Sequence, residues 1–242
     1  MKRLLGFARS LVIYYNPLTM RAWRRFYAEI LGRGDLAIDV GAHVGTRTRA
    51  MRACGARVIA LEPQRLFARF LRCTLPGDVV LIEAAAGSRE ATAEMAVSSR
   101  HPTVSSLHTD FVASAAKTQG FDHVRWDRVE RVPMVTLDAI IARYGQPSYV
   151  KIDCEGFEIE VLSGLSQPPG MVSVEYLPAF ASLTHAVITR LEELGDYRFN
   201  PVVGERSGFL WSDFRDASAV RGWLDSLIPE APSGDLFARL VD

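Results

Sequence analysis

Short runs of apolar residues recur along this chain and alternate with longer segments of helical periodicity. Residues 36–40, 57–61, 79–83, 148–152 and 171–174 are almost entirely apolar, which is typical of strands buried on both faces of a parallel sheet. In most of the segments between them, apolar residues recur three or four positions apart, and glycine ends several of these segments. The pattern predicts an α/β fold built on a parallel sheet.

The first predicted strand and the turn after it are the most informative stretch. The strand ends in Gly41, a second glycine follows at Gly45, and a helical segment begins at Thr46. Strand, glycine turn and helix open a nucleotide-binding βαβ unit, in which a ligand lies against bare backbone and faces the N–H groups of the helix. We therefore expect Gly41, His43, Gly45 and Thr46 to contact a nucleotide-like cofactor.

Two acidic residues indicate which cofactor this is. Glu62 stands at the tip of the second strand, where a βαβ site binds a ribose diol, and Asp39 lies at the end of the first strand. A dinucleotide site requires Gly-x-Gly-x-x-Gly, but here His43 stands in place of the middle glycine. Asp39 would repel a pyrophosphate and accept from an ammonium group, so S-adenosyl-L-methionine is favoured over NAD. The simpler alternative is a strand, turn and helix with two accidental acids.

Small residues follow the third predicted strand in the run Ala84-Ala-Ala-Gly87. Side chains of this size would let an adenine ring lie flat against the backbone, so Ala85 is a further candidate for cofactor contact. The alternative is a tight turn with no ligand.

Four motifs carry a family resemblance: Asp39-Val-Gly-Ala-His-Val-Gly45, Leu61-Glu-Pro63, Thr136-Leu-Asp138 and Lys151-Ile-Asp-Cys-Glu-Gly156. In order and spacing they resemble the FkbM-type methyltransferases over most of the chain, and the last motif is the most specific. His43 and Cys154 depart from that pattern, which commonly has Asn and a β-branched aliphatic residue there.

The resemblance implies a class I S-adenosylmethionine-dependent methyltransferase with a Rossmann-like sheet. It implies seven mostly parallel strands, with the last strand antiparallel between the fifth and sixth, and helices on both faces. The closing strands are predicted at residues 197–199, 208–211 and 234–240, with a helix near 220–227. The resemblance further implies methylation of a hydroxyl oxygen on a sugar, polyketide or other natural product.

Acidic residues at the ends of the later strands are the candidates for catalysis. Ligands of an open α/β sheet lie outside the carboxyl ends of its strands, and Asp153 ends the strand that should lie beside the first one. We therefore expect Asp153 near the sulfonium and the methyl group, as a cofactor contact and a candidate base. Glu155, Glu175 and His101 are further candidate bases, and Lys151 would orient the acids or a substrate oxygen.

Each of these catalytic assignments has an alternative. Asp153 and Glu155 would serve structure alone if one carboxylate capped the next helix and the other bonded Lys151. His101 would be a loop histidine without a catalytic role. Asp153, Glu155 and Glu175 could also offer oxygen atoms to Mg²⁺, but the sequence lacks a typical octahedral cluster, and we predict no metal.

The chain is predicted to divide into an N-terminal extension, residues 1–33, and a catalytic domain, residues 34–242. Within the domain, residues 88–134 interrupt the alternation of strand and helix, and 91–97 and 129–132 alternate like paired strands. An insertion of this length beside a ligand site is usually functional, so it is expected to form the substrate wall.

The N-terminal extension is strongly basic, with seven Lys and Arg against Glu29 alone. A helix capped by Asn16 and Pro17 is expected to follow, packing Trp23 and Tyr27 on the domain with its arginines in solvent. The alternative is a basic amphipathic surface that docks on a membrane or forms part of a substrate lid. The apolar run at residues 11–15 is too short to span a bilayer.

Composition narrows the class of protein further. The 28 basic and 28 acidic residues cancel, which gives no general electrostatic case for binding nucleic acid. The three cysteines form no Cys-x-x-Cys pair and indicate reduced thiols in a cytoplasmic protein. The expected function is O-methylation of a small hydroxylated acceptor. The alternatives are a nicotinamide-dependent oxidoreductase and a non-catalytic, membrane-associated binding module.

Overall fold

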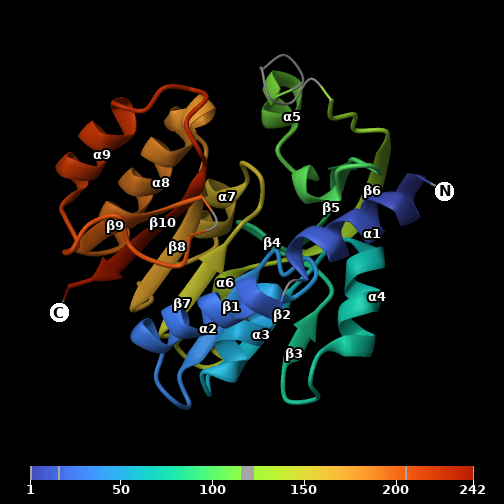
Figure 1. The fold of residues 1–242 in the computed structure, drawn as a ribbon, viewed down its shortest axis with the longest axis horizontal. Helices are drawn as coiled ribbons and strands as arrows, with labels where there is room; N and C mark the ends of the chain where they lie inside the picture. The colour runs from blue at the N-terminus through green and yellow to red at the C-terminus, as the bar shows by residue number, and fades with distance from the viewer. Residues whose placement is uncertain (1, 16, 116–122, 205, 242) are drawn as a thin grey trace.

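A seven-stranded sheet with helices on both faces forms the centre of the molecule (Figure 1). The computed structural model describes residues 2–15, 17–115, 123–204 and 206–241. Within these ranges the strand order is β3-β2-β1-β7-β8-β10-β9. The strands are β3 (Val80–Ile82), β2 (Arg57–Leu61), β1 (Leu36–Val40), β7 (Tyr149–Ile152), β8 (Met171–Tyr176), β10 (Gly234–Leu240) and β9 (Tyr197–Val203).

The topology confirms the predicted fold class. The strands from β3 to β8 pair in parallel, whereas β10 is antiparallel to both β8 and β9, between which it lies. β1 and β7 are neighbours, so their carboxyl ends, and the turns that follow them, meet at one edge of the sheet. This is the all-but-one-parallel sheet of class I methyltransferases.

The two faces of the sheet are packed by different helices, because side chains alternate along each strand. Leu36, Ile38 and Val40 of β1 belong to the larger core, which is shared with α6, α7, α8 and α9. Ala37 and Asp39 point to the opposite face, toward α2 and α3. These helices are α6 (Leu137–Tyr144), α7 (Glu158–Ser163), α8 (Ala181–Leu194), α9 (Ala217–Asp225), α2 (Pro17–Ile30) and α3 (Thr46–Ala53).

Local signals explain where several of these helices begin and end. The Thr136 hydroxyl accepts the N–H of Ala139 at 3.1 Å and so caps α6, as its position before an apolar run predicts. Gly145 ends the same helix with φ +104°. In α2, Trp23 and Tyr27 are completely buried while Arg21, Arg24 and Arg25 are exposed, so the helix packs on the sheet as expected. Asn16, its expected cap, lies outside the described residues.

The insertion forms a separate three-stranded sheet with the order β4-β6-β5, seen in green at the upper right of Figure 1. The predicted pairing of residues 91–97 is confirmed, since β5 (Ala91–Val97) runs antiparallel to β6 (Arg128–Val135). Two features of this region differ from expectation. The small-residue run contains β4 (Ala85–Ala86), which pairs with β6, and the insertion also contains α5 (Thr109–Ala115).

One predicted strand is wrong. Residues 208–211 form bends, and the side chain of Asn200 bonds the backbone there: its Nδ2 donates to the Trp211 carbonyl and its Oδ1 accepts the Trp211 N–H. This segment packs through Phe209, whose ring lies 5.0 Å from Phe26 and 5.4 Å from Phe237. The segment is therefore a loop in which Phe209 is half-buried and Leu210 is 45% exposed, and the Leu210 N–H donates to the Pro201 carbonyl at 2.7 Å.

Two helices lie beside the sheet edge formed by β2 and β3. They are α1 (Lys2–Tyr14) and α4 (Arg65–Thr74), which meet where Phe7 contacts the rings of Phe67 and Phe70. No helix in the described ranges combines the length and apolar character that a bilayer span requires.

Candidate active site at the carboxyl ends of the parallel strands

A cavity of about 280 Å³ lies at the carboxyl ends of β1, β2, β7 and β8. Most of the predicted site residues line this one cavity. They are Asp39, Gly41, His43, Thr46, Glu62, Ala85, Lys151, Asp153, Glu155 and Glu175. The residues that were expected to bind a cofactor and those that were expected to act on a substrate therefore share one space.

Gly41 allows the chain to turn where β1 meets β7. Its φ is +84°, and a Cβ at this position would lie 2.0 Å from the carbonyl oxygen of Asp153. Its N–H and that of Ala42 both donate to the carbonyl of Leu61, at 3.1 and 2.9 Å. The turn is thereby held against the end of β2, and only glycine fits in it.

Glu62 connects this turn to the second strand. Its Oε2 accepts the N–H of His43 at 2.7 Å and its Oε1 accepts the N–H of Gln64 at 2.8 Å. The residue is 2% exposed, and burial raises the pKa of its carboxyl to about 7, although both N–H donors oppose the shift. Each oxygen keeps a lone pair for a second donor, as binding to a diol requires.

Asp39 is completely buried, and only one of its two carboxylate oxygens accepts a hydrogen bond from the described residues. The hydroxyl of Thr48 donates to its Oδ2, while its Oδ1 has no hydrogen-bond partner among the described residues. Burial raises the pKa of Asp39, in spite of Lys151 nearby and the bond from Thr48. A buried acceptor in the wall of a cavity is costly without a donor, so this oxygen suits a ligand that supplies one. Thr48 was not predicted as a site residue, although it lies in the first turn of α3, directly after the glycine turn.

His43 and Thr46 connect the glycine turn to α1. The His43 Nε2 lies 3.1 Å from Ser10 Oγ, and the Thr46 hydroxyl donates to the carbonyl of Tyr14 at 2.7 Å. His43 also has φ +50°, a left-handed conformation that is costly for a histidine. Burial lowers the pKa of His43 to about 4, so its ring is neutral at physiological pH. Both residues line the cavity, and both hold the N-terminal helix over it.

Two predicted residues are not among the described residues that line the cavity. Gly45 begins α3 with φ +77° and faces Arg49 and Leu71, where it serves the turn. His101 lies on the outer side of its loop, with Nδ1 2.6 Å from the Arg9 guanidinium. Burial, followed by the nearby Arg9 charge, lowers the pKa of His101. This position favours the alternative in which His101 has no catalytic role.

The buried Lys151 of β7 forms an ion pair with Asp153, a half-exposed residue just after the strand, with Nζ 2.8 Å from Oδ2. Burial alone would lower the pKa of Lys151, but the carboxylates of Asp153, Asp39 and Asp235 together raise it above its usual value. Burial likewise opposes ionisation of Asp153, and the Lys151 and Arg47 charges nevertheless hold its pKa below the ordinary value. Asp153 is therefore a stable anion and a weak proton acceptor.

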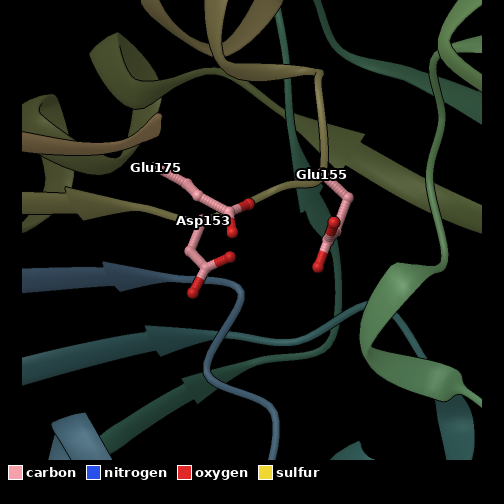
Figure 2. Close-up of side chains that lie close together, drawn as sticks. All are labelled: Asp153, Glu155 and Glu175. Carbon is pink, nitrogen blue, oxygen red and sulfur yellow. The ribbon is translucent and has the colours of Figure 1, made fainter. Parts of the chain in front are cut away.

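Glu155 and Glu175 lie close to Asp153 in the wall of the cavity (Figure 2). The Glu175 carboxylate extends toward Asp153, and Glu155 reaches the same space from the turn after β7. Oε2 of Glu175 is buried and lacks a hydrogen-bond partner in the described part of the chain. Burial first, and then the neighbouring carboxylates, raise the pKa of both glutamates well above its ordinary value. Of the three carboxyl groups, those of Glu155 and Glu175 therefore have the greater affinity for a proton.

A different glutamate caps the turn after β7. Oε1 of Glu158 accepts the N–H groups of Cys154 and Gly156 at 3.1 and 3.2 Å. Glu155 takes no part in that cap, and its backbone has φ +51°, a left-handed conformation for a residue with a side chain. The local structure thus leaves the Glu155 carboxylate available to the cavity.

Asp153, Glu155 and Glu175 each offer an oxygen atom within 4.8 Å of the others. Carboxylate oxygens at this spacing match the ligands that a hard divalent cation prefers. Lys151 already balances one of the three charges. The raised pKa values of Glu155 and Glu175 favour a proton on one of them, which would balance a second charge. The predicted absence of a metal remains a prediction.

The cavity also has walls away from the strand ends. Ile13, Tyr14 and Thr19 line it from α1 and α2, which is consistent with the alternative of a substrate lid, and that alternative stays a prediction. The insertion contributes Met95, Thr103, Ser105 and Leu107. The Ser106 hydroxyl donates to the Glu155 carbonyl at 2.7 Å, so the insertion also holds the acidic turn. That this wall contacts the substrate stays a prediction.

Solved structures with similar folds include three methyltransferases. An O-methyltransferase from Bacillus cereus in complex with SAH is 11% identical, with a TM-score of 0.48, over 98% of this chain and 88% of that one. A TehB-like SAM-dependent methyltransferase from Corynebacterium glutamicum is 9% identical (TM-score 0.47, 96% and 94% covered). A precorrin-6y C5,15-methyltransferase from Geobacter metallireducens is 15% identical (TM-score 0.45, 90% and 87% covered).

Comparison of the sequence with family models identifies the family of the chain. No curated protein matches it. The family model described as the methyltransferase FkbM domain matches residues 39–199, which include the glycine turn, Glu62, the Lys151–Asp153 pair and Glu175. This match covers more than half of the chain and confirms the resemblance seen in the motifs: the protein belongs to the FkbM methyltransferase domain family.

Proposed function

We propose that the protein transfers a methyl group from S-adenosyl-L-methionine to a hydroxyl oxygen of a small natural product or sugar. The observation that carries the proposal is the shared cavity, which Asp39 and Glu62 line together with Asp153, Glu155 and Glu175. One pair of acids suits a cofactor with an amino group and a ribose diol. The other acids suit an acceptor that must lose a proton.

The fit of the cofactor is supported by two features of the cavity wall. The unpartnered Oδ1 of Asp39 lacks a donor, which an ammonium group would supply. Glu62 is fixed by two backbone N–H groups and retains acceptor capacity for a diol. Gly41 leaves the backbone bare at the turn between them. Ala85 and its neighbours offer the small side chains that an adenine ring requires.

When bound, S-adenosylmethionine supplies a methyl group on a sulfonium, which is an excellent leaving group. The protein therefore mainly has to align the acceptor oxygen with the methyl carbon. In our proposal the Lys151–Asp153 pair orients the reacting groups. Glu175, assisted by Glu155, takes the hydroxyl proton as the oxygen–carbon bond forms and the carbon–sulfur bond breaks. The buried, unpartnered Oε2 of Glu175 supports this assignment.

Titration calorimetry with S-adenosylhomocysteine and with NAD tests the cofactor. We expect S-adenosylhomocysteine to bind and NAD to give no heat, because a pyrophosphate would face the buried Asp39 carboxylate. Binding of NAD alone would support the oxidoreductase alternative instead. Incubation with methyl-labelled S-adenosylmethionine and a panel of hydroxylated sugars and polyketides then tests the acceptor. Label that is stable to base in the product is expected for an ether.

A further inference from the structure

The outer face of α1 carries apolar side chains in solvent. Leu5 is 63% exposed and Val12 is 82% exposed, and these residues lie two helical turns apart on one face. The opposite face, with Ser10, packs on the domain. A helix on a protein surface normally turns polar residues outward, so an apolar outer face marks a surface that binds a partner.

The apolar face continues from α1 into α2. Ile13 and Tyr15 are 49% and 42% exposed, and Leu18, near the start of α2, is 75% exposed. Figure 1 shows the two helices in blue, running from the N-terminus at the right across the middle of the view. We call this the α1–α2 surface, made of Leu5, Val12, Ile13, Tyr15 and Leu18.

The helices that form or adjoin this surface are basic in sequence although the whole chain is neutral. α1, α2 and the neighbouring α4 each carry three Lys or Arg, and Glu29 is the single acid in their sequences. Arg21 and Arg25 are exposed and lie one and two helical turns beyond Leu18 on the same side of α2. Arg65 and Arg69 are exposed on α4. Apolar side chains beside a basic rim are the arrangement of an interfacial helix.

We propose that the α1–α2 surface docks the protein on an anionic lipid bilayer. Charge complementarity selects this partner: the rim matches phosphate headgroups, and the apolar side chains reach the acyl boundary. α1 has 13 residues and lies along the surface of the domain, so it would lie in the plane of the bilayer. The proposal goes beyond methyl transfer, and it holds for any ligand of the cavity.

The same helix forms part of the cavity. Ile13 and Tyr14 line it, and the Tyr14 carbonyl accepts from the Thr46 hydroxyl beside the glycine turn. Docking through α1 would therefore bring the cavity close to the lipid headgroups. It would also couple lipid binding to affinity for S-adenosylhomocysteine, because both depend on where α1 lies.

Vesicle flotation of the full-length protein tests docking without any need for catalysis. Wild-type protein should float with vesicles of phosphatidylglycerol and phosphatidylcholine, float less with phosphatidylcholine alone, and be released by high salt. Leu5→Glu/Val12→Glu should lower the partition coefficient by about tenfold or more, because it removes apolar contacts with the acyl boundary. Arg21→Glu/Arg25→Glu should lower it by about 30-fold or more, because it removes two basic charges and adds two acidic ones that the headgroups repel.

The matched control is Ile228→Glu, since Ile228 is 65% exposed and follows α9, across the molecule from α1 (Figure 1). This variant should float like wild type. Unchanged thermal melting of each variant shows that folding is retained. The proposal is overturned if wild type stays at the bottom of the gradient, or if Ile228→Glu loses flotation equally. It is also overturned if light scattering shows a dimer that Leu5→Glu/Val12→Glu dissociates, because the surface would then bind a second copy.

Discussion

Oε2 of Glu62 accepts the backbone N–H of His43 at 2.7 Å, which joins the tip of β2 to the turn after β1. The bond fixes the carboxylate and the glycine turn relative to one another, so two halves of the cofactor site are built as one unit. His43 adopts a left-handed conformation in making it. The cost of that conformation is offset by a charge-assisted bond in a buried setting.

Glu62→Ala should weaken S-adenosylhomocysteine binding by about 1–3 kcal/mol, since the ligand diol would lose its acceptor. That range corresponds to about 5- to 150-fold in Kd, which calorimetry resolves. Glu90→Ala is the matched control, because Glu90 is an exposed acid near the same edge of the sheet. Equal affinity in wild type and Glu62→Ala would remove Glu62 from the cofactor site.

Cofactor affinity should depend on pH through Glu62. Its pKa is about 7 in the folded protein, against 4.5 for a free glutamate, so the carboxyl is mostly protonated at pH 6. Affinity for S-adenosylhomocysteine should therefore rise with pH and be about tenfold weaker at pH 6 than at pH 8. The sign for stability is opposite: the contribution of Glu62 to the free energy of unfolding is greatest below pH 4.5 and is lost as pH rises through 7. Glu62→Gln should flatten both dependences.

Gly41→Ala should be much more costly than a glycine substitution elsewhere. Gly34 has a similar φ of +88°, but no heavy atom lies within 4 Å of a Cβ there. Gly34→Ala should cost about 1–2 kcal/mol for the left-handed backbone alone. Gly41→Ala should cost about 2–5 kcal/mol, because the Asp153 carbonyl must also move. Urea denaturation measures the difference, and similar midpoints for the two variants would contradict the close approach.

The acids at the far end of the cavity should affect rate more than cofactor affinity. Glu175→Gln should lower the initial rate of methyl transfer by about 10²–10⁴-fold, which is typical when a general base is lost. Asp153→Asn should also slow transfer more than it weakens S-adenosylhomocysteine binding. Asp78→Asn is the control, since Asp78 pairs with Arg52 on the surface. Equal losses of rate and affinity in Asp153→Asn would assign Asp153 to cofactor binding alone.

Chelation should leave activity unchanged, because Lys151 balances one of the three carboxylates and the raised pKa values of Glu155 and Glu175 favour a proton on a second. The initial rate of methyl transfer is measured after dialysis against EDTA and again after adding back Mg²⁺ or Mn²⁺. Loss of activity that either ion restores would show that Asp153, Glu155 and Glu175 bind a cation.

The sequence indicated most of the sheet because burial is encoded locally. A strand such as β1 is buried along its whole length and is apolar except for Asp39, and a helix such as α6 is capped by Thr136 and ended by Gly145 for reasons within a few residues. The segment at 208–211 shows the limit of this reasoning. Its apolar residues predict a strand, yet the Asn200 side chain bonds its backbone, which no local pattern shows.

The sequence by itself determined the parallel α/β frame and the acids at its strand ends, since a fixed topology brings those ends to one edge. Only the tertiary structure decided how each acid is used. Glu158 accepts the N–H groups of the turn after β7, and His101 lies against Arg9. Oδ1 of Asp39 and Oε2 of Glu175 have no hydrogen-bond partner among the described residues. The tertiary structure also brought α1 over the cavity. These outcomes depend on contacts between segments far apart in the chain, which the period and composition of one segment do not encode.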